Sequence, residues 1–395
     1  MTALLASLFW GILTLWVPGR WALSVLEVAL FALLFQRIAR RIRAGGSFHL
    51  HPVAWLLGGA AAWGLVQVAG GWTVYRLLTQ EAALNWFTNL VAFSLALSLS
   101  CSQAEREQFF RATLVFATFI AVLSIFTVLT SPPGMVFWRF AVDSDLPTLG
   151  PFVYRNQYAA FVEAILPIVI VQAIRDKRRR MLYTIVTATL FGSVVAGGSR
   201  TGTALCLAEI LAVPALAFAR GMVSRRQFMG TVLGSLIAVA VFTGVVGWET
   251  IWKRFQEPNA YAMRLQFVKS SFAMVRDRPW TGFGLGTWSA AYPAYALFDD
   301  GLFANQAHND WIQWAAEGGI LFFIMVLAIA MWSLRPALRS VWGIGLLTVF
   351  VHCLVDYPMQ QRPALPTLFF AMLGILAGEE NRRRPTHEAE DRLSC

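Results

Sequence analysis

The sequence predicts an all-α, polytopic integral membrane protein, and its composition, low charge and repeated apolar runs support this. The chain has 395 residues, of which 57% are hydrophobic and 14% are charged, against about 25% charged residues in ordinary soluble domains. Apolar segments recur along nearly the whole chain, each close to the roughly 20 residues that a helix needs to cross a bilayer. Such a chain buries its surface in lipid and in contacts between helices.

The apolar runs predict about twelve transmembrane helices within residues 1–378. The first run lacks the basic start and the cleavage site of a signal peptide, so we expect a retained helix. The polar stretch 379–395 predicts a disordered tail. The expected spans are 2–17, 20–36, 53–70, 85–101, 110–130, 153–174, 181–197, 202–219, 228–247, 311–333, 338–355 and 363–378.

The distribution of basic residues predicts the orientation of these spans. An even number of spans places both termini on one side, where the loops and the tail hold 20 Lys and Arg, against 6 in the short loops opposite. The positive-inside rule then places both termini in the cytoplasm. Residues 248–310 become a long outer loop between the ninth and tenth spans. The net charge of +10 lies in these short clusters, which argues against binding of nucleic acid.

The most informative short motif is Ser199-Arg200-Thr201-Gly202, which lies between the apolar runs 181–197 and 204–219. An arginine between two such runs is costly unless it has an anionic partner or reaches a wet surface. Nothing acidic lies close to it in the sequence. A cation held at the outer face by a tight glycine turn therefore predicts an anionic ligand, such as a lipid-linked phosphate.

The long loop contains a predicted helix over 260–276. At 100° per residue its apolar side chains gather on one side, and Lys269 and Arg276 fall on the other. Arg264 projects inside the apolar arc, so a ligand role and a solvated side chain remain equally open. The following segment 279–288 has three glycines at alternate positions, whose N–H groups could bind phosphate. A purely structural turn is the favoured alternative.

The loop ends in a polar motif just before the tenth span. Asn309 or Asp310 could cap that helix, which would place His308 at the positive end of the helix and keep its ring neutral. A neutral imidazole can accept a proton. An interfacial histidine that only hydrogen bonds to the cap is the favoured alternative from these residues alone.

Together these motifs resemble the O-antigen ligase and polymerase superfamily of bacterial envelope glycosyltransferases. The resemblance covers about 150–375, whereas the first five spans match only in being hydrophobic. It rests on the order of five motifs: Gly-Ser-Arg-Thr-Gly at 198–202, Arg264, Asp-Arg-Pro-Trp-Thr-Gly-Phe-Gly at 277–284, His-Asn-Asp-Trp at 308–311 and Ala-Glu-Gly-Gly-Ile at 316–320.

The resemblance implies a transferase of lipopolysaccharide biosynthesis in the bacterial inner membrane, with its active site facing the periplasm. The donor would be a glycan on undecaprenyl diphosphate. The acceptor hydroxyl would lie on lipid A–core oligosaccharide in a ligase, or on another lipid-linked glycan in an O-antigen or exopolysaccharide polymerase. By resemblance, Arg200 and Arg264 match the arginines that hold the diphosphate, and His308 matches the essential loop histidine.

The expected mechanism is an inverting displacement without metal or cofactor. His308 would take the proton from the acceptor hydroxyl, and the two arginines would stabilise the leaving diphosphate. Asp299 and Asp300 could bind a divalent ion, but adjacent carboxylates in a loop are usually only solvated.

Several other polar residues are secondary candidates. His352 and Asp356 lie four apart, so they are expected to share a helix face and either to satisfy each other or to join the site. Arg155 and Asn156 open the sixth span and could line the donor cavity. A polysaccharide-lipid transporter or flippase is the alternative from another class, and it would use carboxylates within the spans as proton relays. Those carboxylates, which could equally be protonated helix contacts, are Glu27, Glu163 and Glu209.

Overall fold

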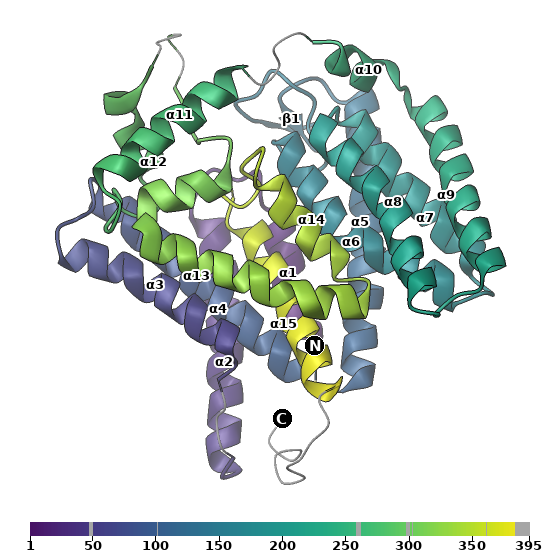
Figure 1. The fold of residues 1–395 in the computed structure, drawn as a ribbon, viewed down its shortest axis with the longest axis horizontal. Helices are drawn as coiled ribbons and strands as arrows, with labels where there is room; N and C mark the ends of the chain where they lie inside the picture. The colour runs from purple at the N-terminus through teal and green to yellow at the C-terminus, as the bar shows by residue number, and fades with distance from the viewer. Residues whose placement is uncertain are drawn as a thin grey trace. The chain divides into compact units, whose positions relative to one another are not determined.

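The described residues are mostly helical, as the sequence predicts. The computed structural model describes residues 1–46, 50–100, 102–257, 262–297, 301, 303–360 and 362–383. Figure 1 labels their elements. Two short antiparallel strands, β1 (Met135–Val136) and β2 (Phe140–Ala141), form the one sheet in the described part of the chain. The chain divides into two compact units, each made of three segments.

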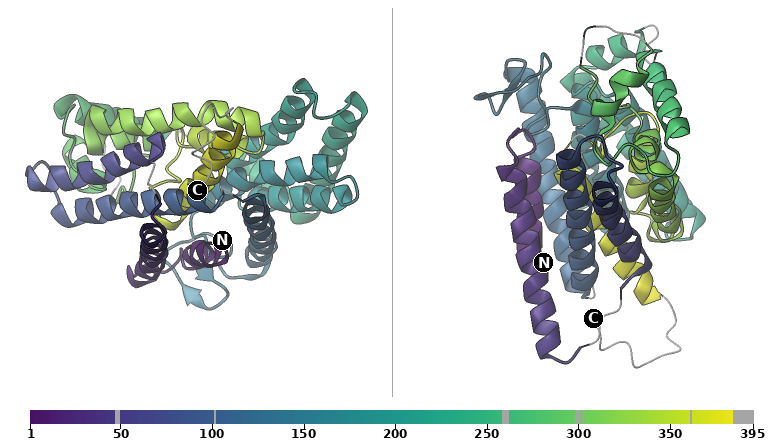
Figure 2. Two further views of the ribbon diagram at one scale, coloured as in Figure 1. Left: turned by 90° about the horizontal axis from the view of Figure 1, so that it is seen from below. Right: turned by 90° about the vertical axis from the view of Figure 1, so that its left-hand side faces the viewer.

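Unit 1 comprises Met1–Leu23, Ser102–Pro258 and Leu334–His352. Its central helix is α6, which packs against α5, α7, α8 and α14 and is 94% buried over its most apolar stretch. Helices α6 to α9 run side by side in Figures 1 and 2. The helices of unit 1 are α1 (Thr2–Leu13), α5 (Gln103–Thr130), α6 (Arg155–Arg175), α7 (Arg180–Ala196), α8 (Arg200–Ala219), α9 (Arg225–Val246), α10 (Glu249–Phe255) and α14 (Ile344–His352).

Unit 2 comprises Ser24–Cys101, Asn259–Ser333 and Cys353–Cys395. Its α4 packs against both α3 and α15, and α11 packs against the 3₁₀ turn η1. Two helices cross the unit boundary, α2 near its start and α13 near its end. The elements of unit 2 are α2 (Trp21–Arg43), α3 (Pro52–Ala69), α4 (Arg76–Leu99), α11 (Ala262–Asp277), α12 (Trp288–Ala291), η1 (Tyr292–Tyr295), α13 (Asp310–Ser340) and α15 (Ala364–Arg383).

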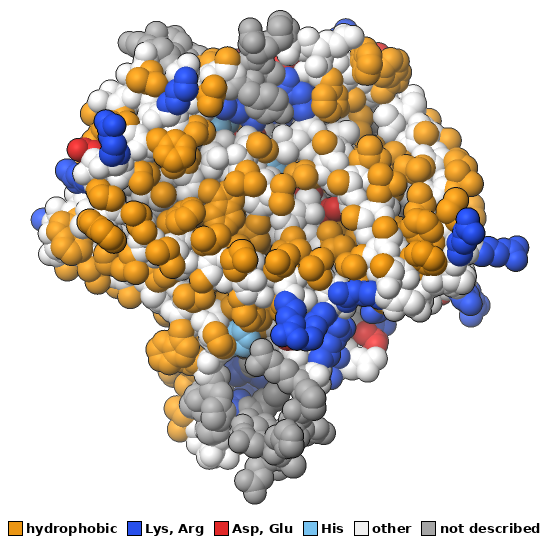
Figure 3. Space-filling view, viewed as in Figure 1, with side chains coloured by type: hydrophobic (Ala, Val, Ile, Leu, Met, Phe, Trp, Pro, Cys, Tyr) orange, Lys and Arg blue, Asp and Glu red, His pale blue; other side chains and the backbone are white. Residues whose placement is uncertain are grey.

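The exposed surface of the helices is apolar enough to require lipid. Eight helices in the described ranges are long and apolar enough to cross a membrane: α2, α3, α4, α5, α6, α8, α9 and α13. On α9 an exposed apolar stripe repeats every four residues, ending at Val245, which is 81% exposed. Hydrophobic side chains cover most of the face seen in Figure 3. Soluble proteins rarely expose such continuous apolar surface, so the chain is a membrane-embedded helical protein.

The count of twelve spans stays a prediction, and one expected span is wrong as a continuous helix. Residues 338–355 were expected to cross the membrane, but α13 continues to Ser340 and α14 contains only nine residues. Nine residues rise about 14 Å, less than half the roughly 30 Å hydrocarbon core. Hydropathy detects the apolar content of this region but not the turn between the two helices. The helices at 2–17, 181–197 and 363–378 form, as α1, α7 and α15, but fall outside the eight.

A kink in α13 organises unit 2. Gly319 has φ 71° and ψ −177°, which interrupts the helix and frees backbone carbonyls from their helical partners. Other parts of unit 2 satisfy these carbonyls. Ala316 O accepts from Phe283 N at 3.1 Å, Glu317 O from Gly284 N at 2.9 Å and Gly318 O from Trp63 Nε1 at 2.8 Å.

This kink predicts an unequal response to two glycine substitutions. A Cβ on Gly319 would overlap the Trp280 carbonyl, whereas Gly221, with a similar φ of 68°, has open space around it. Gly221→Ala therefore costs only the left-handed backbone penalty, about 1 kcal/mol. Gly319→Ala adds overpacking of about 2–3 kcal/mol. Thermal unfolding of the detergent-solubilised protein should show a much larger loss for Gly319→Ala, and equal losses would contradict this account of the kink.

Candidate functional site

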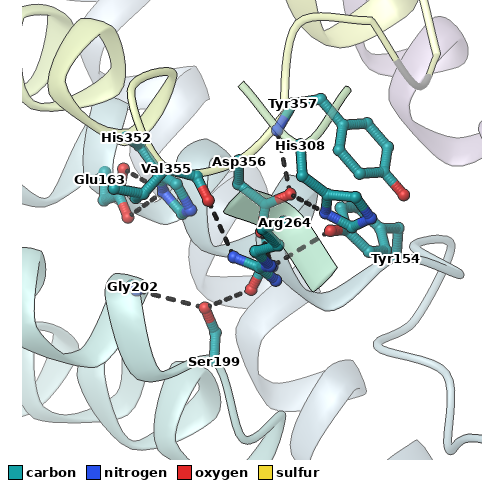
Figure 4. Close-up of polar contacts among 11 residues, drawn as sticks. Tyr154, Glu163, Ser199, Gly202, Arg264, His308, His352, Val355, Asp356 and Tyr357 are labelled. Atoms are coloured by element: carbon teal, nitrogen blue, oxygen red, sulfur yellow. Dashed lines mark hydrogen bonds and ion pairs between the residues drawn. The ribbon is translucent and has the colours of Figure 1, made fainter. Parts of the chain in front are cut away.

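Arg200 lies at the start of α8, in the tight turn that the sequence predicts. Gly198 has φ 68°, which lets the chain reverse between α7 and α8. Ser199 is the N-cap of α8, because its hydroxyl oxygen accepts from Gly202 N at 3.2 Å. The same hydroxyl donates to Asn156 Oδ1 at 2.7 Å, and the cap contact is drawn in Figure 4. These bonds fix the first turn of α8 against the start of α6.

The partner that Arg200 lacks in sequence is supplied by the fold. Its side chain is 10% exposed, and Nη1 lies 3.5 Å from a carboxylate oxygen of Glu257. Nη1 also donates to Arg254 O at 2.7 Å, in the last turn of α10. The positive end of a helix dipole favours anions rather than cations, so a guanidinium at the start of α8 needs such acceptors. An anion of higher charge would satisfy it better than one carboxylate.

Arg155 belongs to the same group of charges. It opens α6 and interacts electrostatically with Arg254, Glu257 and Arg200. We call these four residues the arginine cluster. It combines three guanidinium groups, one carboxylate and the N-termini of two packed helices. Helix N-termini and arginines both bind phosphate oxygens well, so the cluster suits a polyanionic ligand.

Arg264 in α11 is held by a buried carboxylate. Its Nη2 lies 3.1 Å from Asp356 Oδ2, and the Asp356 side chain is fully buried. Its Nη1 donates to Val355 O at 2.8 Å. Lys269 and Arg276 on the same helix are exposed, as the helical periodicity predicts. The position of Arg264 inside the apolar arc therefore marks a specific contact rather than a solvated charge.

His308 shares the same carboxylate. Its Nδ1 lies 3.3 Å from Asp356 Oδ1. Its ring stacks on Phe267, with centroids 5.7 Å apart and planes at 12°, and meets the edge of Tyr357 at 4.6 Å. Figure 4 shows Asp356 between Arg264 and His308. We call these three residues the histidine cluster; the imidazole is oriented by the carboxylate and by two aromatic rings.

The residues after His308 anchor the segment that carries Asp356. Asn309 Oδ1 accepts from Ile312 N at 3.0 Å, so Asn309 rather than Asp310 caps α13. Asn309 Nδ2 donates to Leu354 O at 2.6 Å, and the Asp310 carboxylate accepts from Met359 N at 3.1 Å. In the His-Asn-Asp motif, His308 is thus the candidate base and Asn309 is the helix cap. Asn309 and Asp310 also hydrogen bond to the segment on either side of Asp356.

The glycine-rich segment 279–288 is a structural turn, so the phosphate interpretation of its N–H groups is wrong. Gly286 N and Trp288 N donate to the carboxylate of Glu317 at 2.9 and 3.1 Å. Leu285 N donates to Gln67 Oε1 at 3.0 Å. The donors are therefore used inside unit 2. Glu317 belongs to the Ala-Glu-Gly-Gly-Ile motif, and nothing in its local sequence indicates these distant partners.

His352 and Asp356 do not form the expected pair on a helix face. Helix α14 ends at His352, so a spacing of four residues no longer places the two side chains together. His352 Nδ1 instead bonds Glu163 at 2.8 Å, and both side chains are fully buried (Figure 4). Glu163 thereby has a partner within unit 1, and Asp356 belongs to the histidine cluster.

The described residues contain no group of three or more His, Cys, Asp or Glu side chains arranged to hold a metal ion. Asp299 and Asp300, considered above as ligands for a divalent ion, lie outside the described residues.

The comparison with known families agrees with the motif order. Residues 185–327 match the family model described as O-antigen ligase. The matched stretch includes Arg200, Glu257, Arg264 and His308, whereas Asp356 lies beyond it. No curated protein matches the chain. The matched stretch contains all five ordered motifs, and the match supports the resemblance to the O-antigen ligase and polymerase superfamily.

Proposed function

We propose that the protein is a membrane glycosyltransferase that moves a glycan from undecaprenyl diphosphate to an acceptor hydroxyl. The proposed acceptor is lipid A–core oligosaccharide, at the periplasmic face of the bacterial inner membrane. The observation that carries this proposal is the histidine cluster, in which one buried carboxylate holds both an arginine and a histidine in a chain that resembles this family.

The arginine cluster would bind the diphosphate of the donor. When the bond between the anomeric carbon and the phosphate oxygen breaks, negative charge grows on the phosphate oxygens. Arginines already fixed in place stabilise that charge more in the transition state than in the ground state. Arg200 is held by its hydrogen bond to Arg254 O, and Arg155 adds a third positive charge beside Arg254.

His308 would act as the general base. The acceptor oxygen attacks the anomeric carbon, its proton passes to the imidazole, and the diphosphate leaves with the bonding electron pair. Asp356 at Nδ1 orients the ring and stabilises the imidazolium once the proton arrives. Because Nδ1 faces the Asp356 carboxylate at 3.3 Å, Nε2 is the nitrogen that would meet the acceptor. A single displacement of this kind inverts the anomeric configuration.

We propose that Arg264 also contributes positive charge to binding of the diphosphate, as the family resemblance implies. A polymerase would use the same chemistry with a lipid-linked glycan as acceptor, so offering the two acceptors separately distinguishes the activities.

His308→Ala tests the proposed function. The variant should fold and reach normal levels but lose transfer, because the acceptor hydroxyl no longer has a base. The measurement is release of undecaprenyl diphosphate by purified protein given a lipid-linked glycan and an acceptor. His51→Ala, which removes the cap of α3, is the control and should retain transfer. Robust transfer by His308→Ala would refute the assignment.

Replacing the phosphate-binding arginines by lysine should also impair transfer. Lysine keeps the charge but loses the planar fork that binds phosphate through two N–H groups. Arg200→Lys and Arg264→Lys should each lower kcat/KM by about 10²–10³. Arg276→Lys, on the exposed side of α11, should stay within about twofold of the parent. Unchanged kinetics in both site variants would contradict a role in binding the diphosphate.

Glu257→Gln should strengthen donor binding. The carboxylate occupies Arg200, so the diphosphate must displace it before it can bind. Glu257 is 50% exposed, and exposed ion pairs contribute at most about 1 kcal/mol, which limits the expected fall in donor KM to about fivefold. Glu249→Gln, at the other end of α10, should leave KM unchanged. A higher KM in Glu257→Gln would mean that this carboxylate positions Arg200 instead of competing for it.

A further inference from the structure

The backbone of His308 has a conformation that its neighbours must enforce. Its φ is 53°, in the left-handed region that residues with a side chain rarely adopt. Such conformations persist only where surrounding contacts over-determine them, and they concentrate at functional sites. The contacts that hold the residues on either side of His308 therefore decide where its ring points.

On the preceding side the contact is made by Gln313. Its Oε1 accepts from Ala307 N at 2.9 Å, and the Gln313 side chain is 1% exposed. Its Nε2 donates to Glu317 Oε1 at 3.0 Å and also to Gln306 Oε1. Because two oxygen acceptors face Nε2, the amide can present only its oxygen to Ala307. The orientation of Gln313 is thus determined by its surroundings.

On the following side Asn309 fixes the chain through its cap on Ile312 and its bond to Leu354 O. Both peptide neighbours of His308 are therefore anchored to α13, the first by Gln313 and the second by Asn309. With both sides fixed, the ring is directed toward Asp356 and lies against Phe267. Freeing either side would let φ relax and would move the ring away from this place.

We infer that Gln313 is a positioning residue that aims the His308 imidazole at the acceptor by fixing the Ala307 peptide. Glu317 supports it, because the same carboxylate that holds Gln313 also holds the N–H groups of Gly286 and Trp288. This inference rests on the proposed function of His308. It adds a residue that contacts neither donor nor acceptor and acts only through the geometry of the base.

The test compares Gln313→Met with a matched control, Gln67→Met. Gln67 is fully buried in the same unit and also makes three hydrogen bonds, to Thr281 O, Glu317 O and Leu285 N at 2.6, 2.8 and 3.0 Å. None of these involves the loop that carries His308. Both variants should lower the thermal unfolding midpoint by similar amounts. Only Gln313→Met should lower kcat, by about 10- to 100-fold, with donor KM within about twofold.

Two further variants separate positioning from general damage. Gln313→Glu keeps an oxygen acceptor for Ala307 N and can share a proton with Glu317. This variant should therefore keep most of the kcat that Gln313→Met loses. It also tests the positioning role if Gln313→Met does not fold. In the His308→Ala background, Gln313→Met should cause no further loss of the residual rate, because residues that act through one group are not additive.

The outcomes are distinguishable. Equal losses of kcat in Gln313→Met and Gln67→Met, or normal kcat in Gln313→Met, would overturn the inference and leave the role of His308 intact. Full transfer by His308→Ala would instead overturn the proposed function itself.

Discussion

The arrangement of unit 2 depends on one buried carboxylate. A fully buried carboxylate is unfavourable unless charges and hydrogen-bond donors compensate for its lost hydration. Asp356 obtains these from Arg264, from His308 and from the N–H of Tyr357. The requirement ties together three stretches of chain that are remote in sequence: α11, the loop before α13 and the segment after α14. The proposed base and one proposed phosphate ligand therefore owe their positions to the same group, and neither can be understood without it.

The Glu317 carboxylate similarly holds together backbone segments that are distant in the sequence. Glu317 lies beside the kink at Gly319, where carbonyls lose their helical partners and a glycine-rich turn brings its own unpaired N–H groups. The turn and the kink satisfy each other, with Gln67 and Trp63 from α3 completing the set. Separately, the Glu317 carboxylate accepts from Gln313, whose own oxygen accepts from Ala307 N in the loop of His308. Buried polar groups thus hold the backbone of this unit in place, and the position of the proposed base depends on them.

Sequence reasoning succeeded where the signal is local. Periodicity predicted α11 and set Arg264 apart from Lys269 and Arg276, and residue type offered Asn309 as one of two candidate caps of α13. It failed where partners are distant: the pairing of Arg200 with Glu257 and of Asp356 with His308 depends on tertiary packing that spacing does not encode. The expected pairing of His352 with Asp356 required one continuous helix through both residues, but α14 ends at His352. The span at 338–355 failed for a related reason, because hydropathy averages over residues and does not register a turn.

The contact between Arg200 and Glu257 has a consequence for selectivity among ions. Since Glu257 is part of the chain, its local concentration beside the guanidinium is constant and independent of the surrounding solution. A chloride ion offers only the single charge that the tethered carboxylate already provides, and as a single atom it has no second acceptor with which to engage the neighbouring arginines. A diphosphate brings greater charge and several acceptor atoms at once. If Arg200 binds the donor as proposed, the internal pair would discriminate by valence, because it would exclude monovalent ions and still yield to the diphosphate headgroup.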